Sequence, residues 1–155
     1  MTLELGHPAP DFTAQLSDES EITLSKLSGS KVVLYFYPKD NTPGCTSEGE
    51  GFRDQYDAFQ HANTLVFGVS KDSISSHQKF REKYRFPFEL ISDPDETLCK
   101  LYDVIRLKKL YGKEFMGIER STFLIGVDGS LQHIWRKVRI NNHIHDVLQA
   151  AKTLD

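Results

Sequence analysis

Cysteine is scarce in this chain of 155 residues: the only two are Cys45 and Cys99, far apart in sequence. Two cysteines are too few for a disulfide scaffold, and their separation excludes a C-x-x-C redox pair and a cysteine-based zinc site. Each thiol is therefore either a small buried apolar side chain or a reactive nucleophile. The residues around each cysteine have to decide between the two.

Long apolar runs are also missing, because the longest covers only residues 32–37. A bilayer-spanning helix needs about 20 such residues, so no membrane partner is expected. The first residues, MTLELGHPAPDF, lack a basic region followed by an apolar stretch, and thus do not resemble a signal peptide. A net charge of -3 without a basic face argues against binding to nucleic acid. We therefore expect a cytoplasmic protein, in a compartment that keeps thiols reduced.

Apolar residues make up 39% and charged residues 26% of the chain, an ordinary composition for one globular domain. Predicted strands and helices alternate along it. The strands are expected at residues 31–37, 64–70, 88–91, 121–127 and 131–137, and the helices at 43–61, 73–84, 94–102 and from Asn142, a predicted cap, onward. This order predicts an α/β domain of the thioredoxin-like type, with a central mixed sheet flanked by helices.

Cys45 follows the loop at the carboxyl end of the first buried strand, where open α/β sheets place their ligands. Thr42 is a good helix N-cap and Pro43 suits the first helical position, so Cys45 falls in the first helical turn. Unpaired N–H groups and the helix dipole favour an anion there, which for a thiol is the reactive thiolate. The alternative is an ordinary helical cysteine, but the polar, turn-rich surroundings favour the nucleophile.

The run Phe36–Thr46, FYPKDNTPGCT, resembles the active-site signature Pro-x-x-x-Thr-x-x-Cys of the peroxiredoxins. Its fuller form resembles the peroxiredoxin Q branch, also called bacterioferritin comigratory proteins. The resemblance extends over nearly the whole chain, through the segments APDF at 9–12, FRD at 52–54, SDP at 92–94, YGK at 111–113 and RSTFLI at 120–125.

This resemblance implies one thioredoxin-like peroxiredoxin domain over residues 1–155, a peroxide substrate, and neither a metal nor an organic cofactor. Cys45 would attack the peroxide and become a sulfenic acid. Thr42 and the Cys45 N–H would donate to the peroxide oxygens, Arg120 would hold the thiolate, and Pro38 would shield the site from water. Glu48 would either orient Arg120 or be a first-turn carboxylate that the helix dipole favours.

A second, resolving cysteine is missing at both positions where the branch usually carries one, which here are Glu50 and, in the next helix, the neighbourhood of Arg81. Cys99 alternates with leucines in a short helix and is expected to be buried. We therefore expect a one-cysteine cycle, with thioredoxin, glutaredoxin or glutathione as the reductant. The alternative is that Cys99 resolves Cys45 after local unfolding of the helix that contains Cys45.

The helix that begins just before Cys45 is itself expected to unfold locally. It contains Gly49 and Gly51, each of which costs about 1 kcal/mol relative to alanine in a helix interior. Opening would expose Cys45 to any reductant, so it does not select Cys99.

Two further groups of residues are expected to lie on the solvated surface. His143 and His145 stand two apart in the last helix, so they do not face each other, and no metal site is expected. Residues 106–113 are expected to form a basic loop.

Two functions remain in competition. The first is a thiol peroxidase, expected to be monomeric as much of the branch is. The second is a thioredoxin-like redox sensor or binding protein with little turnover, which the missing resolving cysteine favours. A thiol–disulfide exchange protein is disfavoured, because it normally needs C-x-x-C.

Overall fold

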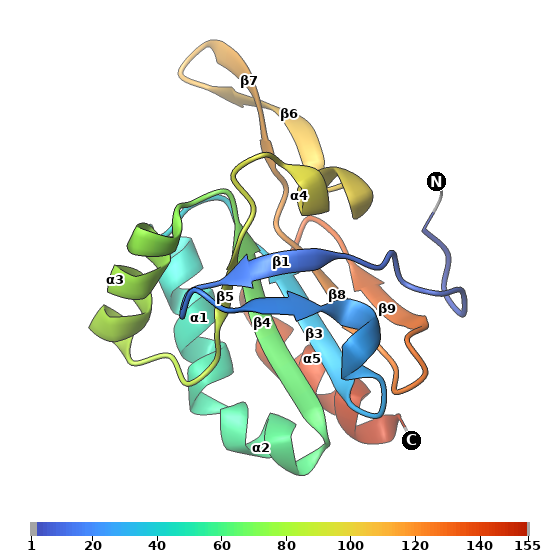
Figure 1. The fold of residues 1–155 in the computed structure, drawn as a ribbon. Coiled ribbons are helices and arrows are strands. Elements are labelled where there is room, and N and C mark those ends of the chain that lie inside the picture. Colours follow the sequence, from blue (N-terminus) through green and yellow to red (C-terminus); the bar gives the residue numbers. More distant parts are fainter. Residues whose placement is uncertain (1–2, 155) are drawn as a thin grey trace.

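The computed structural model describes residues 3–154, which form a seven-stranded mixed sheet with helices on both faces and a separate two-stranded hairpin (Figure 1). The main sheet has the order β2-β1-β5-β4-β3-β8-β9. Its strands are β1 (Thr13–Leu16), β2 (Glu21–Thr23), β3 (Lys31–Phe36), β4 (Thr64–Ser70), β5 (Leu90–Ser92), β8 (Ser121–Ile125) and β9 (Leu131–Trp135). The helices are η1 (Leu24–Leu27, a 3-10 turn), α1 (Pro43–Asp54), α2 (Tyr56–His61), α3 (Ile74–Tyr84), α4 (Thr97–Leu101) and α5 (His143–Thr153).

The centre of the sheet is β3, the strand predicted from its run of β-branched and aromatic residues. All six of its residues are buried, as a strand covered on both faces requires. It pairs in parallel with β4 and antiparallel with β8, so the carboxyl end of β3 meets the beginning of β8. This register brings Phe36 opposite Ser121 and thereby places the loop before Cys45 next to the residues that begin β8.

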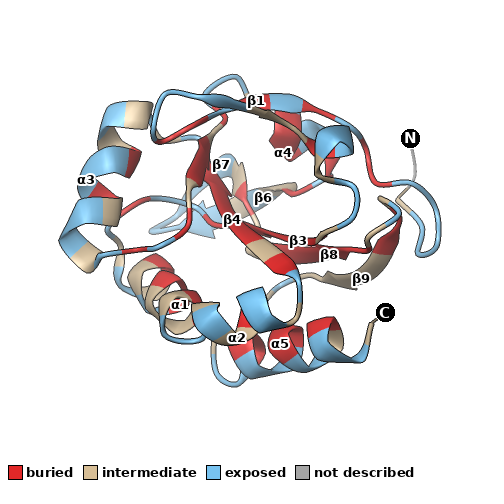
Figure 2. Cartoon of the chain, turned by 60° about the horizontal axis from the view of Figure 1, so that its bottom comes forward, coloured by how far each residue is buried: buried red, intermediate tan, exposed pale blue. Residues whose placement is uncertain are grey.

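Two apolar cores lie on opposite faces of the sheet, because side chains alternate along each strand. Leu34 and Phe36 of β3 point into one core, together with α4. Val33 and Tyr35 point into the other, which α1, α2, α3 and α5 cover. Figure 2 shows the central strands almost entirely buried and the helices buried only on their inner sides. The predicted α/β fold with a mixed central sheet is confirmed.

Some element boundaries differ from the prediction. The helix expected over 43–61 is broken at Gln55, which separates α1 from α2. The short helix expected from Pro94 begins only at Thr97, where the Asp93 carboxylate accepts hydrogen bonds from the N–H groups of Leu98 and Cys99. Asn142 does precede α5, but it has a φ of 63° and its side chain makes no capping hydrogen bond.

The basic loop expected around residues 106–113 is instead a β-hairpin, which projects from the body of the molecule (Figure 1). Its strands are β6 (Ile105–Leu110) and β7 (Lys113–Ile118). Tyr111 and Gly112 both have positive φ, 52° and 77°, as a two-residue hairpin turn of the primed type requires. The strands pair only with each other within the described chain. Among residues 3–154, none of the helices has the length and apolar character needed to cross a membrane.

Candidate active site

Cys45 lies in the first turn of α1, as predicted. Thr42 occupies the N-cap position with extended backbone and Pro43 is the first helical residue. The bond from the Thr46 N–H to the Thr42 carbonyl, 2.8 Å long, opens the helical ladder. The N–H groups of Gly44 and Cys45 precede that bond, so no carbonyl within the helix is available to them. The Cys45 side chain is only 2% exposed, so its sulfur lies in a nearly enclosed site next to free N–H donors.

Arg120 connects Cys45 to Glu48. It lies in the short link between β7 and β8, and its Nη2 donates to Cys45 Sγ over 3.4 Å. Its Nη1 donates to Glu48 Oε1 over 2.6 Å in a salt bridge. The planar guanidinium therefore spans the sulfur and the carboxylate with two adjacent nitrogens, a geometry that lysine cannot provide. The structure thus brings together three residues that are far apart in the sequence.

Glu48 is buried in an environment that disfavours its charge. Burial raises the pKa of its carboxyl from 4.5 to about 7, and the neighbouring Arg120 charge opposes this only in part. Its second oxygen, Oε2, has no hydrogen-bond partner among residues 3–154. A proton on that oxygen would leave the Oε1 hydrogen bond from Arg120 in place but would remove the negative charge that makes the contact a salt bridge.

Thr42 and Pro38 border the same loop. The Thr42 hydroxyl donates its proton to the Lys39 carbonyl over 2.8 Å, which leaves its lone pairs to accept a hydrogen bond from a bound hydroperoxide. The role expected from the resemblance, donation to the peroxide, requires that bond to be released. Pro38 lies two residues after the end of β3 and is exposed. Its shielding role stays a prediction.

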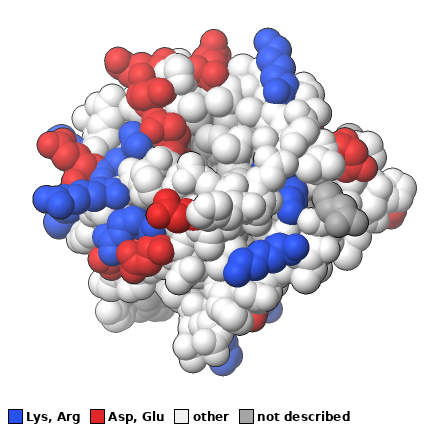
Figure 3. Space-filling view, turned by 90° about the horizontal axis from the view of Figure 1, so that it is seen from below, with Lys and Arg blue, Asp and Glu red and all other residues white. Residues whose placement is uncertain are grey.

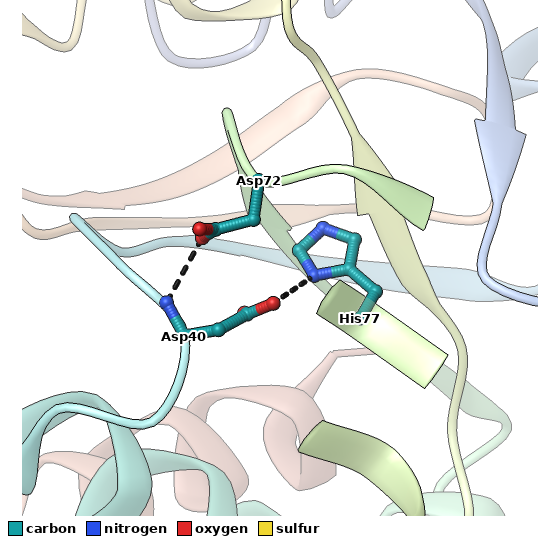
Figure 4. Close-up of side chains that lie close together, drawn as sticks. All are labelled: Asp40, Asp72 and His77. Carbon is teal, nitrogen blue, oxygen red and sulfur yellow. Dashed lines mark hydrogen bonds and ion pairs between the residues drawn. The ribbon is translucent and has the colours of Figure 1, made fainter. Parts of the chain in front are cut away.

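The loop before Cys45 is held by a polar cluster that the sequence did not reveal, Asp40 with Asp72 and His77 (Figure 4). His77 Nδ1 lies 2.7 Å from Asp40 Oδ2, and the Asp40 N–H donates to Asp72 Oδ2 over 2.9 Å. The hydroxyls of Tyr37 and Ser76 also donate to the Asp40 carboxylate, over 2.6 and 2.7 Å. The ends of β3 and β4 and the start of α3 are thereby tied to the active-site loop.

Both ring nitrogens of His77 face oxygen acceptors. Its Nε2 lies 3.0 Å from the Ile91 carbonyl, which can only accept, and Nδ1 meets a carboxylate that already accepts two hydroxyl protons. The three side chains lie within 4.8 Å of one another, but their ligand atoms are already engaged in these hydrogen bonds, so the cluster is a structural lock rather than a vacant cation site.

His143 was expected on the surface, and this prediction is wrong. It is 4% exposed and its Nε2 lies 2.8 Å from the Thr122 hydroxyl. Its ring packs edge-on against Phe52 and Trp135. Burial, with a smaller effect from the Arg120 charge, lowers the pKa of His143 from 6.5 to about 4. The pattern of two histidines could not show that only the first of them lies on the inner face of α5.

Cys99 is fully buried in the core on the opposite face of the sheet from Cys45. Burial, and then the Asp93 carboxylate beside it, raise the pKa of the Cys99 thiol well above its ordinary value. A thiol in this environment is a poor nucleophile. The sheet itself separates the two sulfurs.

A cysteine at a helix start, facing an arginine that directly precedes the neighbouring strand of an α/β sheet, is an arrangement suited to thiol chemistry, and the class it indicates is that of the thiol peroxidases. The chain belongs to the AhpC/TSA family, whose model matches residues 5–134. It is 46% identical to the peroxiredoxin Bcp of Bacillus subtilis over 99% of this chain and 98% of that one. It is 38% identical to the peroxiredoxin Bcp of Escherichia coli over 94% and 93% of the two chains.

Solved structures agree with these sequence relatives. One is a structure of the Xanthomonas campestris bacterioferritin comigratory protein, from a study of its alkyl peroxide reduction activity, with a TM-score of 0.89, 45% identity and coverage of 97% and 96% of the two chains. Another is a peroxiredoxin Q of Xylella fastidiosa, with a TM-score of 0.92, 41% identity and coverage of 98% and 97%. The chain is therefore a peroxiredoxin of the Bcp or peroxiredoxin Q subfamily, as its sequence predicted.

Proposed function

We propose that Cys45 is the residue that attacks the peroxide, and that this chain contributes no second thiol to the cycle. The observation that carries the proposal is the 3.4 Å contact from Arg120 Nη2 to Cys45 Sγ, with the sulfur carried by the first turn of α1. Both features place positive charge beside the sulfur that would attack the peroxide. We extend the proposal to one peroxiredoxin domain over residues 1–155, acting as a monomer in the cytoplasm.

In this mechanism the Cys45 thiolate attacks one peroxide oxygen, a sulfur–oxygen bond forms, and the oxygen–oxygen bond breaks. The sulfur becomes a sulfenic acid, and the other oxygen leaves with its electron pair and takes up a proton as water or alcohol. Negative charge moves from sulfur to the departing oxygen, so donors fixed around both atoms lower the barrier. Arg120 and the N–H groups of Gly44 and Cys45 supply such donors, and Thr42 accepts the hydroperoxide O–H.

Glu48 is the positioning residue in this scheme. Its 2.6 Å salt bridge holds Nη1 of Arg120, so that Nη2 is directed at the sulfur. Of the two interpretations left open by the sequence, this arrangement supports orientation of Arg120. The other interpretation, a first-turn carboxylate favoured by the helix dipole, is wrong, because α1 begins at Pro43 and its first turn holds no acidic residue.

The return to the thiolate is proposed to require a thiol from outside the chain, such as thioredoxin, glutaredoxin or glutathione. Support comes from the location of Cys99 behind the sheet and from its raised pKa. We propose both hydrogen peroxide and organic hydroperoxides as substrates, the latter by analogy with the alkyl peroxide activity of the Xanthomonas campestris relative.

The test is peroxide consumption coupled to NADPH through thioredoxin and its reductase, with wild type, Cys45→Ser and Cys99→Ser compared side by side. We expect turnover in wild type and Cys99→Ser and none in Cys45→Ser. Arrest of Cys99→Ser after one turnover would make Cys99 the resolving thiol. Arrest of wild type with thioredoxin, glutaredoxin and glutathione alike would favour the redox sensor instead.

A further inference from the structure

The β6–β7 hairpin carries most of the large apolar side chains that are exposed in the described residues. Seven large apolar side chains are exposed in the described chain, and five of them belong to this hairpin: Leu107, Leu110, Tyr111, Phe115 and Met116. Tyr111 at the tip is 95% exposed. Apolar side chains gathered on one projecting element are typical of a binding surface.

The hairpin is also the basic element of an acidic protein. Residues 105–118 hold four basic side chains and one carboxylate, whereas the whole chain has a net charge of -3. Lys109 pairs with Glu114 over 3.4 Å and Arg106 with Asp103 over 3.0 Å, which leaves Lys108 and Lys113 without a salt bridge in the described residues. The face seen from below in Figure 3, at the other end of the molecule, has acidic and basic groups interspersed with broad uncharged areas.

This element is joined directly to the active site. β7 ends at Ile118, and Arg120 follows two residues later. The Glu119 N–H donates to the Val104 carbonyl over 2.7 Å, which closes the base of the hairpin beside the site. Lys108 lies within electrostatic reach of the site as well: burial and the Arg120 charge lower its pKa, whereas the Cys45 sulfur acts in the opposite direction.

We propose that the β6–β7 hairpin is the docking surface for the protein that reduces oxidised Cys45, a dithiol protein whose reactive thiol is surrounded by apolar residues and carboxylates. This inference rests on the proposed function, because Cys45 then needs a thiol from outside. The Cys45 sulfenic acid condenses with one partner thiol to give a mixed disulfide and water. The second partner thiol displaces Cys45 as a thiol and leaves the partner with a disulfide.

The geometry favours this occupant over a membrane. A strand of six residues is about 20 Å long, so a bilayer that takes up only the Tyr111 tip would stay about that far from Arg120. A protein that lies along the side of the hairpin, by contrast, contacts Leu107 and Met116, which are opposite each other in the β6–β7 register, and reaches the site at its base. Docking of two copies through their hairpins would bring like charges together.

The experiment uses the full chain and two kinds of reductant, an acidic thioredoxin with its reductase and NADPH, and dithiothreitol. The hairpin variant is Leu107→Ser with Met116→Ser, and Leu5→Ser is the matched control, because Leu5 and Leu107 are 59% and 58% exposed. We expect the KM for thioredoxin to rise by about ten-fold or more in the hairpin variant alone, with dithiothreitol-dependent turnover unchanged.

A charge variant, Lys109→Glu with Lys113→Glu, repeats the test without altering apolar surface. It should also raise the KM for thioredoxin, and added salt should raise that KM in wild type. An unchanged KM in both hairpin variants would overturn the proposal. The proposal would also be overturned if wild type sediments with phosphatidylglycerol vesicles and the hairpin variants do not, while their KM for thioredoxin is unchanged. That result would assign the hairpin to a membrane.

Failure of Cys45 as the residue that attacks the peroxide gives a different result. One equivalent of peroxide would then leave Cys45 unoxidised by mass spectrometry, whichever reductant is used. Oxidation of Cys45 together with full reduction by dithiothreitol, but none by thioredoxin, would instead keep the peroxidase chemistry and overturn the docking surface.

Discussion

Titration of Glu48 should set the rate at which Cys45 reacts with peroxide near neutral pH. Only the ionised carboxylate matches the Arg120 salt bridge, and the pKa of Glu48 is raised to about 7. For a group with this pKa, the ionised fraction rises from about one tenth at pH 6 to about nine tenths at pH 8. We therefore expect the rate constant for Cys45 oxidation to rise about ten-fold over this range, beyond the change in the thiolate fraction.

Stopped-flow measurement of Cys45 oxidation from pH 5.5 to 8.5 checks this, with the thiolate fraction followed separately by its absorbance at 240 nm. Glu48→Gln is the matched control, because its amide oxygen still accepts from Arg120 but does not titrate. After correction for thiolate, the variant should lose the ten-fold rise. Identical corrected profiles for the two proteins would refute the reasoning.

Folding stability gives a second measurement of the same group. A raised carboxyl pKa means that the folded protein holds a proton which the unfolded chain has released. Stability therefore falls as pH rises from 4.5 to about 7, and the change in pKa corresponds to about 3 kcal/mol. Urea denaturation of Glu48→Gln should lack this fall.

Three further predictions concern residues around the site. Gly49→Ala should lower the unfolding free energy by about 1 to 3 kcal/mol in urea denaturation, since a Cβ there would overlap the packed Phe86 ring. Gly51→Ala is the control: its Cβ meets only the flexible Ile144 side chain, so this variant should lose less stability. The pKa of His143 is lowered to about 4, so the unfolded chain takes up a proton at a higher pH than the folded protein does. The unfolding free energy should therefore fall by about 3 kcal/mol as pH drops from 6.5 to 4. His143→Gln should reduce that fall in denaturation curves at the two pH values. Asp40→Asn should lower the unfolding free energy by about 1 to 3 kcal/mol in urea denaturation, because it weakens the hydrogen bonds that Tyr37, Ser76 and His77 make to that carboxylate. Unchanged stability would contradict the lock.

The central elements of the fold could be predicted because their local and tertiary preferences agree. The β-branched and aromatic residues of β3 and β4 favour a strand and are buried on both faces. Ser73 caps α3 through its side chain, and Gly129 with positive φ lies in the turn between β8 and β9, so local signals agree with the fold at these points too. The site followed from the motif around Cys45, together with a resemblance that supplied Arg120.

Other features depend on contacts that no local pattern records. The β6–β7 hairpin turns at Tyr111-Gly112, a weaker turn signal than Asn-Gly, and its strands do not alternate cleanly between apolar and polar residues. His77 lies among polar neighbours in α3, and only the tertiary fold shows that it meets Asp40. The two glycines of α1 were interpreted as weakening the helix. The structure adds that Gly49 allows close packing against Phe86, a tertiary contact that the sequence could not show.

The location of the two sulfurs on opposite faces of the sheet has a kinetic consequence. An internal resolving thiol would act at a high and constant effective concentration, whereas an external thiol acts at the concentration of the free partner. On the one-cysteine proposal, the lifetime of the Cys45 sulfenic acid is then set by the supply of reductant. When peroxide is plentiful and reductant is exhausted, a second peroxide molecule competes for the same sulfur and converts it to a sulfinic acid. The enzyme would thus be inactivated when its supply of reductant fails.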